Sequence, residues 1–391
     1  MRIAATLGLI GLLAPAPLGA ETVIRSAVLR VDVAGLPPIS RLDLPPDDLG
    51  LAGARLGTMD NATTGGFLGQ TFETAELTAT PETAAATLDK AMADGAGFVV
   101  VIADDAMTLT LADSARDRAL ILNAGARGDA LRGTECRANI VHVAPSHAML
   151  ADALAQFLAW KKWDEWFLIS GSHPADLDLA QAYRASATKF GAKIVEDRVF
   201  EDTGGARRTD TGHVQIQKQM PVFTQGAARH DILIAADEAG IFAEYLPYQS
   251  WEARPVAGSA GLVPRSWHPA LEAWGATQFQ NRFEAMAGRP MRDEDYQAWL
   301  AVRIIGEAAT RTGSADPAVL RDHILSPGFE VAGFKGQKLT IRDWDHQLRQ
   351  PILLTTGALT ASVSPQDAFL HQVSQLDTLG KDRPETECSF P

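Results

Sequence analysis

The chain of 391 residues is short of the features that would place it in a membrane or on a nucleic acid. Apart from a brief apolar stretch at residues 3–13, no hydrophobic run approaches the roughly 20 residues that a membrane-spanning helix needs. Basic residues are outnumbered, with 35 Lys and Arg against 48 Asp and Glu, and the formal net charge is −13. This charge argues against nucleic acid and anionic lipid as partners. It leaves an anionic small ligand open, because local basic side chains decide that.

The chain also lacks the sequence motifs of common catalytic sites. It contains no Gly-x-Ser-x-Gly elbow, no His-Glu-x-x-His, no P-loop and no Gly-x-Gly-x-x-Gly. His142 and His147 are separated by Val-Ala-Pro-Ser and have no carboxylate cluster at metal-ligand spacing beside them. We therefore expect no enzyme, no metal site and no catalytic cofactor. Turnover of an alcohol or quinone substrate would overturn this expectation.

Cysteine is scarce, with only Cys136 and Cys388 in the whole chain. In an oxidising compartment an even pair of cysteines favours a disulfide. Such a bond would tie the C-terminal segment to the middle of the chain. Two free thiols are the alternative.

The first 20 residues have the pattern of a secretory signal peptide. Arg2 supplies the positive charge, residues 3–13 the apolar segment, and residues 18–20 a small-residue cleavage site before Glu21. No cysteine follows that site directly, which argues against a lipid-anchored protein. We expect the remaining roughly 370 residues, enough for two domains, to reside in the periplasm.

Strand-like and helix-like segments alternate along the chain, which predicts an α/β fold with parallel sheets covered by helices on both faces. The pattern occurs twice in succession, and further helices follow the second unit. Expected strands lie at residues 22–33, 71–78, 98–102, 119–123, 139–143, 166–169, 193–200, 231–235 and 255–258. Expected helices lie at residues 49–61, 80–94, 146–160, 177–190, 239–246, 276–286, 293–311 and 318–324, with short strands between 329 and 361.

The passage at residues 59–69, Met-Asp-Asn-Ala-Thr-Thr-Gly-Gly-Phe-Leu-Gly, joins the first expected helix to a strand. We expect the helix to end near Asn61 and the chain to turn through Gly65 and Gly66, which can adopt positive φ angles. The strand is expected to begin at Phe67.

This helix–Asn–Gly-Gly–aromatic passage resembles the first helix-to-strand turn of the leucine-binding group of type I periplasmic binding proteins. Three later segments are similar to the same family: residues 99–103 before the ligand loop, Val-Ala-Pro-Ser at 143–146, and Asp-Tyr-Gln-Ala-Trp at 295–299 in a late helix. The likeness covers nearly the whole mature chain, and the order of the segments carries it. It implies two doubly wound lobes joined by three crossing strands.

The resemblance also sets the expected domain boundaries and the partner. Lobe one would comprise residues 21–144 and 276–328, and lobe two residues 145–275 and 329–391, with crossings near residues 144, 264–278 and 327–334. Proteins of this family close on one small ligand and deliver it to an ABC permease and ATPase complex. Because a periplasmic sensor or cofactor carrier would share the fold and the pocket, a role without a transporter is the alternative.

A narrower likeness is to substrate-binding proteins associated with PQQ-dependent alcohol dehydrogenase systems. It rests on short runs at residues 60–61, 160–166, 254–258, 261–264, 274–277 and 347–351, and on Cys136. This likeness implies PQQ or a related compound of the quinone system as the bound ligand. PQQ is planar with three carboxylates, so it would need Arg forks, expected at Arg127, Arg132 and Arg265. It would also need an aromatic platform, expected at Trp267 and Trp274, whose alternative role is to pack the hinge.

In open α/β sheets, ligands bind beyond the carboxyl ends of the strands. This topology adds Asp104, Ser170, His173 and Asp237 to the expected ligand-contacting residues. Amino-acid-binding members of the family carry hydroxylated residues in the loop after the third strand, whereas this chain has Ala-Asp-Asp-Ala at residues 103–106. A carboxylate ligand would be repelled there unless the acids turn away or cap the next helix. A branched-chain amino acid is therefore the alternative ligand and not the first choice.

Overall fold

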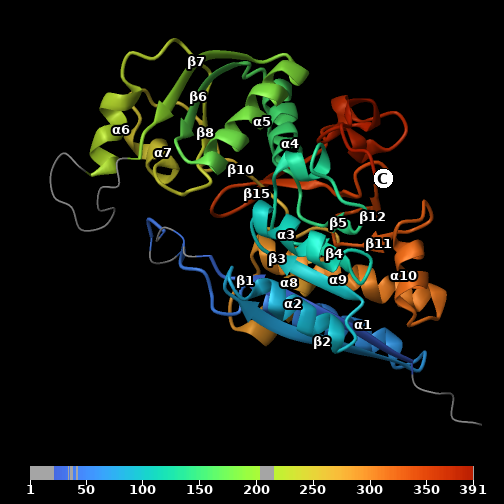
Figure 1. Ribbon diagram of the computed structural model, residues 1–391. Coiled ribbons are helices and arrows are strands. Elements are labelled where there is room, and N and C mark those ends of the chain that lie inside the picture. Colours follow the sequence, from blue (N-terminus) through green and yellow to red (C-terminus); the bar gives the residue numbers. More distant parts are fainter. Residues whose placement is uncertain (1–21, 34, 36–37, 41–42, 203–214, 391) are drawn as a thin grey trace, which may run out of the picture.

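The computed structural model describes residues 22–33, 35, 38–40, 43–202 and 215–390, so the expected signal peptide lies outside the described residues. Two separate parallel sheets form the two lobes, as the alternating pattern predicts (Figure 1). The first sheet has the strand order β2-β1-β3-β4-β5, and every neighbouring pair is parallel. Its strands are β1 (Thr22–Val31), β2 (Gln70–Ala79), β3 (Phe98–Ile102), β4 (Leu120–Asn123) and β5 (Ile140–His142).

Helices cover both faces of the first sheet. One face packs against α1 (Leu51–Gly65), α8 (Ala276–Ala287), α9 (Asp293–Thr312) and α10 (Pro317–Ile324). The other face packs against α2 (Ala84–Ala93) and α3 (Asp105–Ala115). Strand β3, Phe-Val-Val-Val-Ile, is buried along its full length because both faces are covered, which is why it reads as a continuous apolar run.

The second sheet has the order β7-β6-β8-β9 and is also parallel. Its strands are β6 (Glu165–Gly171), β7 (Lys193–Phe200), β8 (Ile232–Ala236) and β9 (Val256–Gly258). One face packs against α4 (His147–Lys161) and α5 (Pro174–Phe190). On the other face lie α6 (Ile216–Thr224), which the sequence analysis does not predict, the 3₁₀ helix η3 (Ala243–Tyr245) and α7 (Leu246–Gln249).

The chain passes three times between the two sheets. The first passage is at residues 143–146, between β5 and α4, and the second runs through β10 (Val263–Arg265) to Trp267 in the first core. The third was expected near residues 327–334 but lies near residues 349–352, so that expectation is wrong. The reason is that β11 (Val331–Ala332), β12 (Lys338–Ile341) and β13 (Leu348–Arg349) form a small sheet whose apolar side chains join the first core. The chain then enters β14 (Ile352–Thr355), which lies between β10 and β15 (Thr360–Ser364).

The turn after α1 differs from its prediction. Helix α1 extends to Gly65, Gly66 keeps a helical φ of −56°, and the positive φ angle of 67° belongs to Gly69. Phe67 lies in the turn with 90% of its surface exposed, and β2 begins only at Gln70. Gly65, the last residue of the helix, lies close to the Phe72 ring: a Cβ on residue 65 would be 2.6 Å from it. Steric space rather than a positive φ therefore requires this glycine.

Between β15 and residue 390, the described chain contains only the short helices η4 (Asp367–Phe369), η5 (Gln375–Thr378) and η6 (Arg383–Glu385). The disulfide expected between Cys136 and Cys388 is confirmed, with 5.7 Å between the two Cα atoms. Cys136 follows the 3₁₀ helix η2 (Asp129–Arg132) and precedes β5. Among the described residues, no helix has the length and apolar character to cross a membrane.

Candidate functional site

A pocket of about 150 Å³ lies between the two lobes, where the loops after β4, β8 and β9 meet the second passage of the chain. Leu150, Leu179 and Tyr183 form an apolar wall from α4 and α5. The remaining lining residues are polar, small or part of the passage: Arg127, Asp237, Glu238, Gly258, Ser259, Val263, Pro264 and Arg265. The pocket thus lies at the carboxyl ends of both sheets, the position that the topology predicts.

Arg127 reaches this pocket from a loop that Asn123 shapes. The Oδ1 atom of Asn123, the last residue of β4, accepts hydrogen bonds from the backbone N–H groups of Gly125 (3.1 Å) and Ala126 (2.8 Å). The backbone carbonyl of Arg127 accepts a hydrogen bond of 2.9 Å from the N–H of His147, at the start of α4. The backbone of Arg127 is therefore fixed on both sides.

Glu238 faces Arg127 from the opposite lobe. Its Oε1 atom lies 3.8 Å from Nη1 of Arg127 and 3.5 Å from Nε2 of His147, both longer than an ordinary N–H···O hydrogen bond. Among the described residues, the polar contact of the Arg127 guanidinium is this 3.8 Å ion pair and not a hydrogen bond. Arg127 and Glu238 thus face each other across the lobe boundary as opposite charges that are too far apart for a hydrogen bond.

The electrostatics keep both groups ionised. Burial opposes the charge on Glu238, but the interaction with His147 and the positive charge of Arg127 outweigh it and lower the pKa of Glu238 to about 2. Burial likewise disfavours the charge on Arg127, yet the carboxylates of Glu238, Asp293 and Glu294 raise its pKa. A group entering between Arg127 and Glu238 therefore meets a full positive and a full negative charge.

Arg265 supplies a second guanidinium on the passage between the lobes. Its Nη1 atom lies 3.2 Å from Oδ2 of Asp293, the first residue of α9. Asp293 also accepts hydrogen bonds from the Ser266 hydroxyl (2.5 Å) and the Trp267 N–H (2.9 Å). Burial disfavours the Asp293 carboxylate, but the two arginines and these hydrogen bonds lower its pKa. Arg265 is thus paired with Asp293, whereas Arg127 keeps unfilled donors.

Asp237 lines the pocket, but its carboxylate is engaged with the backbone. It accepts hydrogen bonds from the N–H groups of Ile241 (2.8 Å), Phe242 (2.7 Å) and Ala243 (2.7 Å). Its own N–H donates to Ser259 Oγ at 2.9 Å. Asp237 therefore shapes the loop that presents Glu238.

The two acids expected to repel a carboxylate ligand are occupied elsewhere. Asp104 caps α3 and accepts a 2.8 Å hydrogen bond from the Met107 N–H, while Asp105 accepts one of 3.1 Å from the Gly128 N–H. Neither residue lines the interlobe pocket. Neither carboxylate therefore repels a carboxylate ligand in this pocket, and Asp104 caps α3 as the alternative expectation stated.

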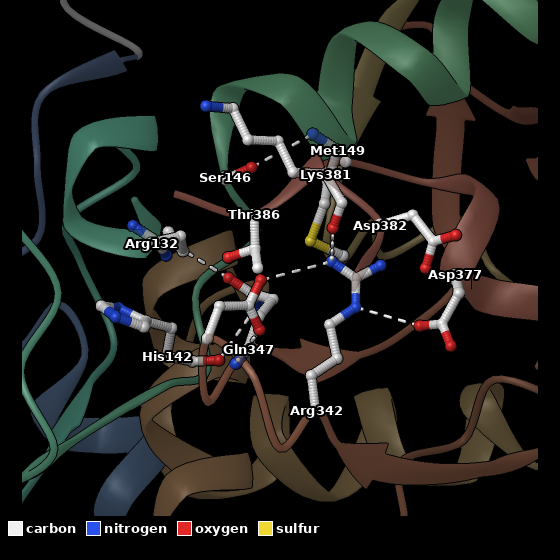
Figure 2. Close-up of polar contacts among 12 residues, drawn as sticks. Arg132, His142, Ser146, Met149, Arg342, Gln347, Asp377, Lys381, Asp382 and Thr386 are labelled. Atoms are coloured by element: carbon white, nitrogen blue, oxygen red, sulfur yellow. Dashed lines mark hydrogen bonds and ion pairs between the residues drawn. The ribbon is translucent and has the colours of Figure 1, made fainter. Parts of the chain in front are cut away.

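Two other predicted contact residues are buried away from the pocket. Arg132 is 4% exposed and donates to Gln347 Oε1 (2.9 Å) and to the carbonyls of Gly128 (3.0 Å) and Ala144 (2.8 Å), as Figure 2 shows for Gln347. Burial lowers its pKa to about 10 despite nearby carboxylates. Trp267 is 1% exposed and stacks on Tyr296 at a centroid distance of 4.9 Å. Arg132 holds the first passage in place, and Trp267 packs the hinge.

Three further predicted residues also lie outside the pocket lining. Trp274 is 50% exposed and packs over Gly336 of the first lobe. Ser170 is fully buried at the end of β6, and its hydroxyl has no partner among the described residues. His173 precedes α5, and its Nε2 atom lies 3.0 Å from Oδ2 of Asp202. Of the nine predicted contacts, the structure brings Arg127, Asp237 and Arg265 together.

Three residues at the pocket were not predicted from the sequence: Glu238, His147 and Tyr183. Glu238 could have been found, because it follows Asp237 directly after a buried apolar strand. His147 showed in sequence only that it lacks a carboxylate cluster at metal-ligand spacing, whereas the fold places its Nε2 atom 3.5 Å from Oε1 of Glu238 and leaves its buried Nδ1 atom without a described partner. Tyr183 has no such pattern, since it lies on α5 among alanines. Within the described ranges, no group of three potential metal ligands comes together.

A family model described as periplasmic binding protein matches residues 48–358 of this chain. The structure is similar to the leucine-, isoleucine-, valine-, threonine- and alanine-binding protein of Brucella ovis in its closed conformation, with 16% identity, a TM-score of 0.72, and 94% of this chain and 99% of that chain covered. It is also similar to a branched-chain amino acid ABC transporter ligand-binding protein of Burkholderia xenovorans (15% identity, TM-score 0.70, coverage 94% and 99%). A third is the solute-binding protein of an R. palustris ABC transporter in complex with benzoate (12% identity, TM-score 0.64, coverage 94% and 99%). No curated protein matches the chain in sequence. These structural likenesses confirm the predicted α/β fold.

Proposed function

Since the chain belongs to the periplasmic binding protein family, we propose that it binds one small zwitterionic solute, of the size of an apolar α-amino acid, between its lobes. The observation that carries the proposal is the incompletely paired Arg127 and Glu238 across the lobe boundary. A ligand carboxylate would accept hydrogen bonds from the free N–H groups of Arg127, and a ligand ammonium would donate hydrogen bonds to Glu238. Leu150, Leu179 and Tyr183 would cover an apolar side chain.

The size of the pocket favours a ligand of this class over PQQ. A cavity of about 150 Å³ holds a molecule of roughly benzene size. PQQ is a fused tricyclic quinone with three carboxylates, and two of the five residues expected to hold it, Arg132 and Trp267, are buried elsewhere. The comparisons give no support to the narrower likeness on which PQQ rested. The relatives that bind amino acids or benzoate are consistent with a small carboxylate.

Lobe closure would couple binding to delivery. A ligand that contacts Arg127 from one lobe and Glu238 from the other favours the closed arrangement over the open one. In the periplasm this closed form would be recognised by an ABC permease and ATPase complex. A sensor or carrier without a transporter remains the alternative, since it would use the same closure.

The proposal is tested by thermal unfolding of the mature protein with a panel of ligands. The panel contains leucine, valine and alanine, the matched carboxylate 4-methylpentanoate, the matched amine isoamylamine, benzoate and PQQ. A ligand at about 100 times its dissociation constant adds roughly 2.7 kcal/mol to stability, which raises the midpoint by several degrees. A shift with an amino acid that exceeds the shifts with both matched analogues supports the proposal. A shift with PQQ or benzoate alone would refute it.

A further inference from the structure

The last part of the chain connects the two lobes independently of the three passages. Residues 377–388, which we call the C-terminal strap, begin within η5 and end at the disulfide-bonded Cys388. One end of the strap is docked on lobe two and the other end is bonded covalently to lobe one. In Figure 1 this segment, drawn in red, lies beside α4 and α5, close to the passages between the sheets.

The first end of the strap is part of the second core. Leu379 is fully buried among side chains of α4, α5 and β6. The N–H of Gly380 donates to Oδ2 of Asp152 on α4 (2.9 Å), and its carbonyl accepts from Nζ of Lys189 on α5 (2.8 Å). A Cβ on Gly380, whose φ is 82°, would lie 2.9 Å from the Met149 side chain, so a larger residue would not dock as closely.

The middle of the strap is held by a buried arginine near the third passage. Arg342 donates to Oδ1 of Asp377 (3.0 Å) and to the carbonyls of Leu379 (2.7 Å) and Lys381 (3.2 Å). Figure 2 shows its guanidinium group directed into the strap, between Asp377 and Lys381. Arg349 makes a second ion pair with Asp377, with 2.7 Å between Nε and Oδ1. The strap is thus ordered by buried charge-assisted hydrogen bonds as well as by its ends.

The far end of the strap is fastened to lobe one through Cys136. The residues that follow Cys136 are fixed on α3: Arg137 pairs with Asp113 (2.7 Å), and Asn139 Nδ2 donates to the carbonyls of Ala112 and Arg116 (both 2.8 Å). Movement of lobe one therefore moves Cys388 with it, while Leu379 moves with lobe two.

We propose that the C-terminal strap limits the separation of the lobes and holds the ligand-free protein near its closed arrangement. Only the eight residues 380–387 lie between the buried anchor Leu379 and the covalent anchor Cys388, and three of them form η6. Opening the cleft would have to unwind this segment or pull Leu379 out of the second core. The inference uses the lobe closure of the proposed function but not the identity of the ligand.

The test is small-angle X-ray scattering of the ligand-free mature protein and three variants. The first variant inserts six Gly and Ser residues between Glu385 and Thr386, which adds slack to the strap and keeps the disulfide. The second is Cys136→Ser with Cys388→Ser. The control inserts the same six residues at Gly357, in the exposed turn between β14 and β15. Adding six residues to a separation of 252 barely changes the closure entropy, so the first variant does not act through the unfolded state.

The expected result is a radius of gyration near the roughly 21 Å of a compact chain of this size for the parent and the control. Both strap variants should give larger values and a longer maximum dimension. If the slack variant matches the parent, or if the control expands as much as the slack variant, the strap does not limit opening. If the radius of gyration rises only in the double cysteine variant, the disulfide merely stabilises the fold. That result would also overturn the inference. No ligand is added in this experiment, so its result can be interpreted even if the thermal-unfolding panel identifies no ligand.

Discussion

Removing the negative charge of Glu238 should weaken recognition of a ligand's ammonium group and leave recognition of its carboxylate intact. In Glu238→Gln the side chain keeps its size and loses the negative charge that faces Arg127 at 3.8 Å. Hydrogen bonds to charged groups contribute about 1.5–3 kcal/mol, which corresponds to about a 10- to 150-fold change in a dissociation constant. We therefore expect leucine to bind Glu238→Gln at least about tenfold more weakly than the parent.

The matched carboxylate should respond in the opposite direction. The compound 4-methylpentanoate has the same branched chain and carboxylate as leucine but no ammonium group, so Glu238 offers it only repulsion. Its affinity should stay unchanged or rise in Glu238→Gln, whereas Arg127→Ala should weaken both ligands because both present a carboxylate to that guanidinium.

Isothermal titration calorimetry of the two ligands with the parent and both variants measures these differences directly. The informative quantity is the ratio of the two dissociation constants, which cancels any general loss of pocket structure. A ratio that is the same in the parent and in Glu238→Gln would refute the assignment of Glu238 to the ligand ammonium. Equal affinities for leucine in the parent and in Arg127→Ala would refute the carboxylate assignment.

Three further predictions concern buried residues that do not line the pocket. Burial lowers the pKa of Lys335 to about 7 from the value of about 10.4 in an unfolded chain, so between these pH values the unfolded chain binds more protons and stability rises with pH. In urea unfolding, the free energy of unfolding of the parent minus that of Lys335→Met should rise by about 1.4 kcal/mol per pH unit between about pH 7.5 and 9.5. A difference that does not change with pH would show that the pKa of Lys335 is not lowered. Gly53→Ala places a Cβ 1.8 Å from the Asp295 carbonyl oxygen of α9, so it should cost about 1–3 kcal/mol or more, whereas Gly66→Ala, with its nearest atom at 3.3 Å, should cost little in the same denaturation assay. Arg132→Met removes the donor to the buried Gln347 Oε1 and to the Gly128 carbonyl, and it removes one of the two donors to the Ala144 carbonyl. It should lower stability by about 2 kcal/mol or more without changing the ratio of the leucine and 4-methylpentanoate dissociation constants; a changed ratio would return Arg132 to the site.

The predictions from sequence were strongest where a residue's role depends on its neighbours along the chain. Strands β3 and β7 were predicted with the bounds that the structure has, and α9 within one residue, because burial on two faces and amphipathic periodicity leave a local pattern. Predictions failed where a packing contact, rather than the local residue pattern, decides the structure. The turn after α1 depends on Phe72, and the third passage depends on the packing of β11–β13 against the first core.

In the candidate site, too, some residues could be placed from the sequence and others only from the fold. Arg127, Asp237 and Arg265 could be assigned to the pocket because each follows or belongs to a segment whose strand order fixes its position. Arg132 and Trp267 looked equally suited to a ligand, since an arginine and a tryptophan in irregular segments carry no local mark of burial. The fold surrounds both with partners, which include Gln347, 215 residues from Arg132, and Gln280, 13 residues from Trp267.

The sequence by itself determined the α/β class, the doubled unit, the acidic surface and the cysteine pair, because composition and periodicity act over short stretches of chain. Only the tertiary structure decided that Asp105 accepts a hydrogen bond from the Gly128 N–H and that Arg127 meets Glu238 across the lobe boundary. It also decided that the C-terminal strap bridges both lobes. The physical reason is that hydrogen bonding and charge pairing between distant segments depend on atomic distances that exist only after both sheets have packed.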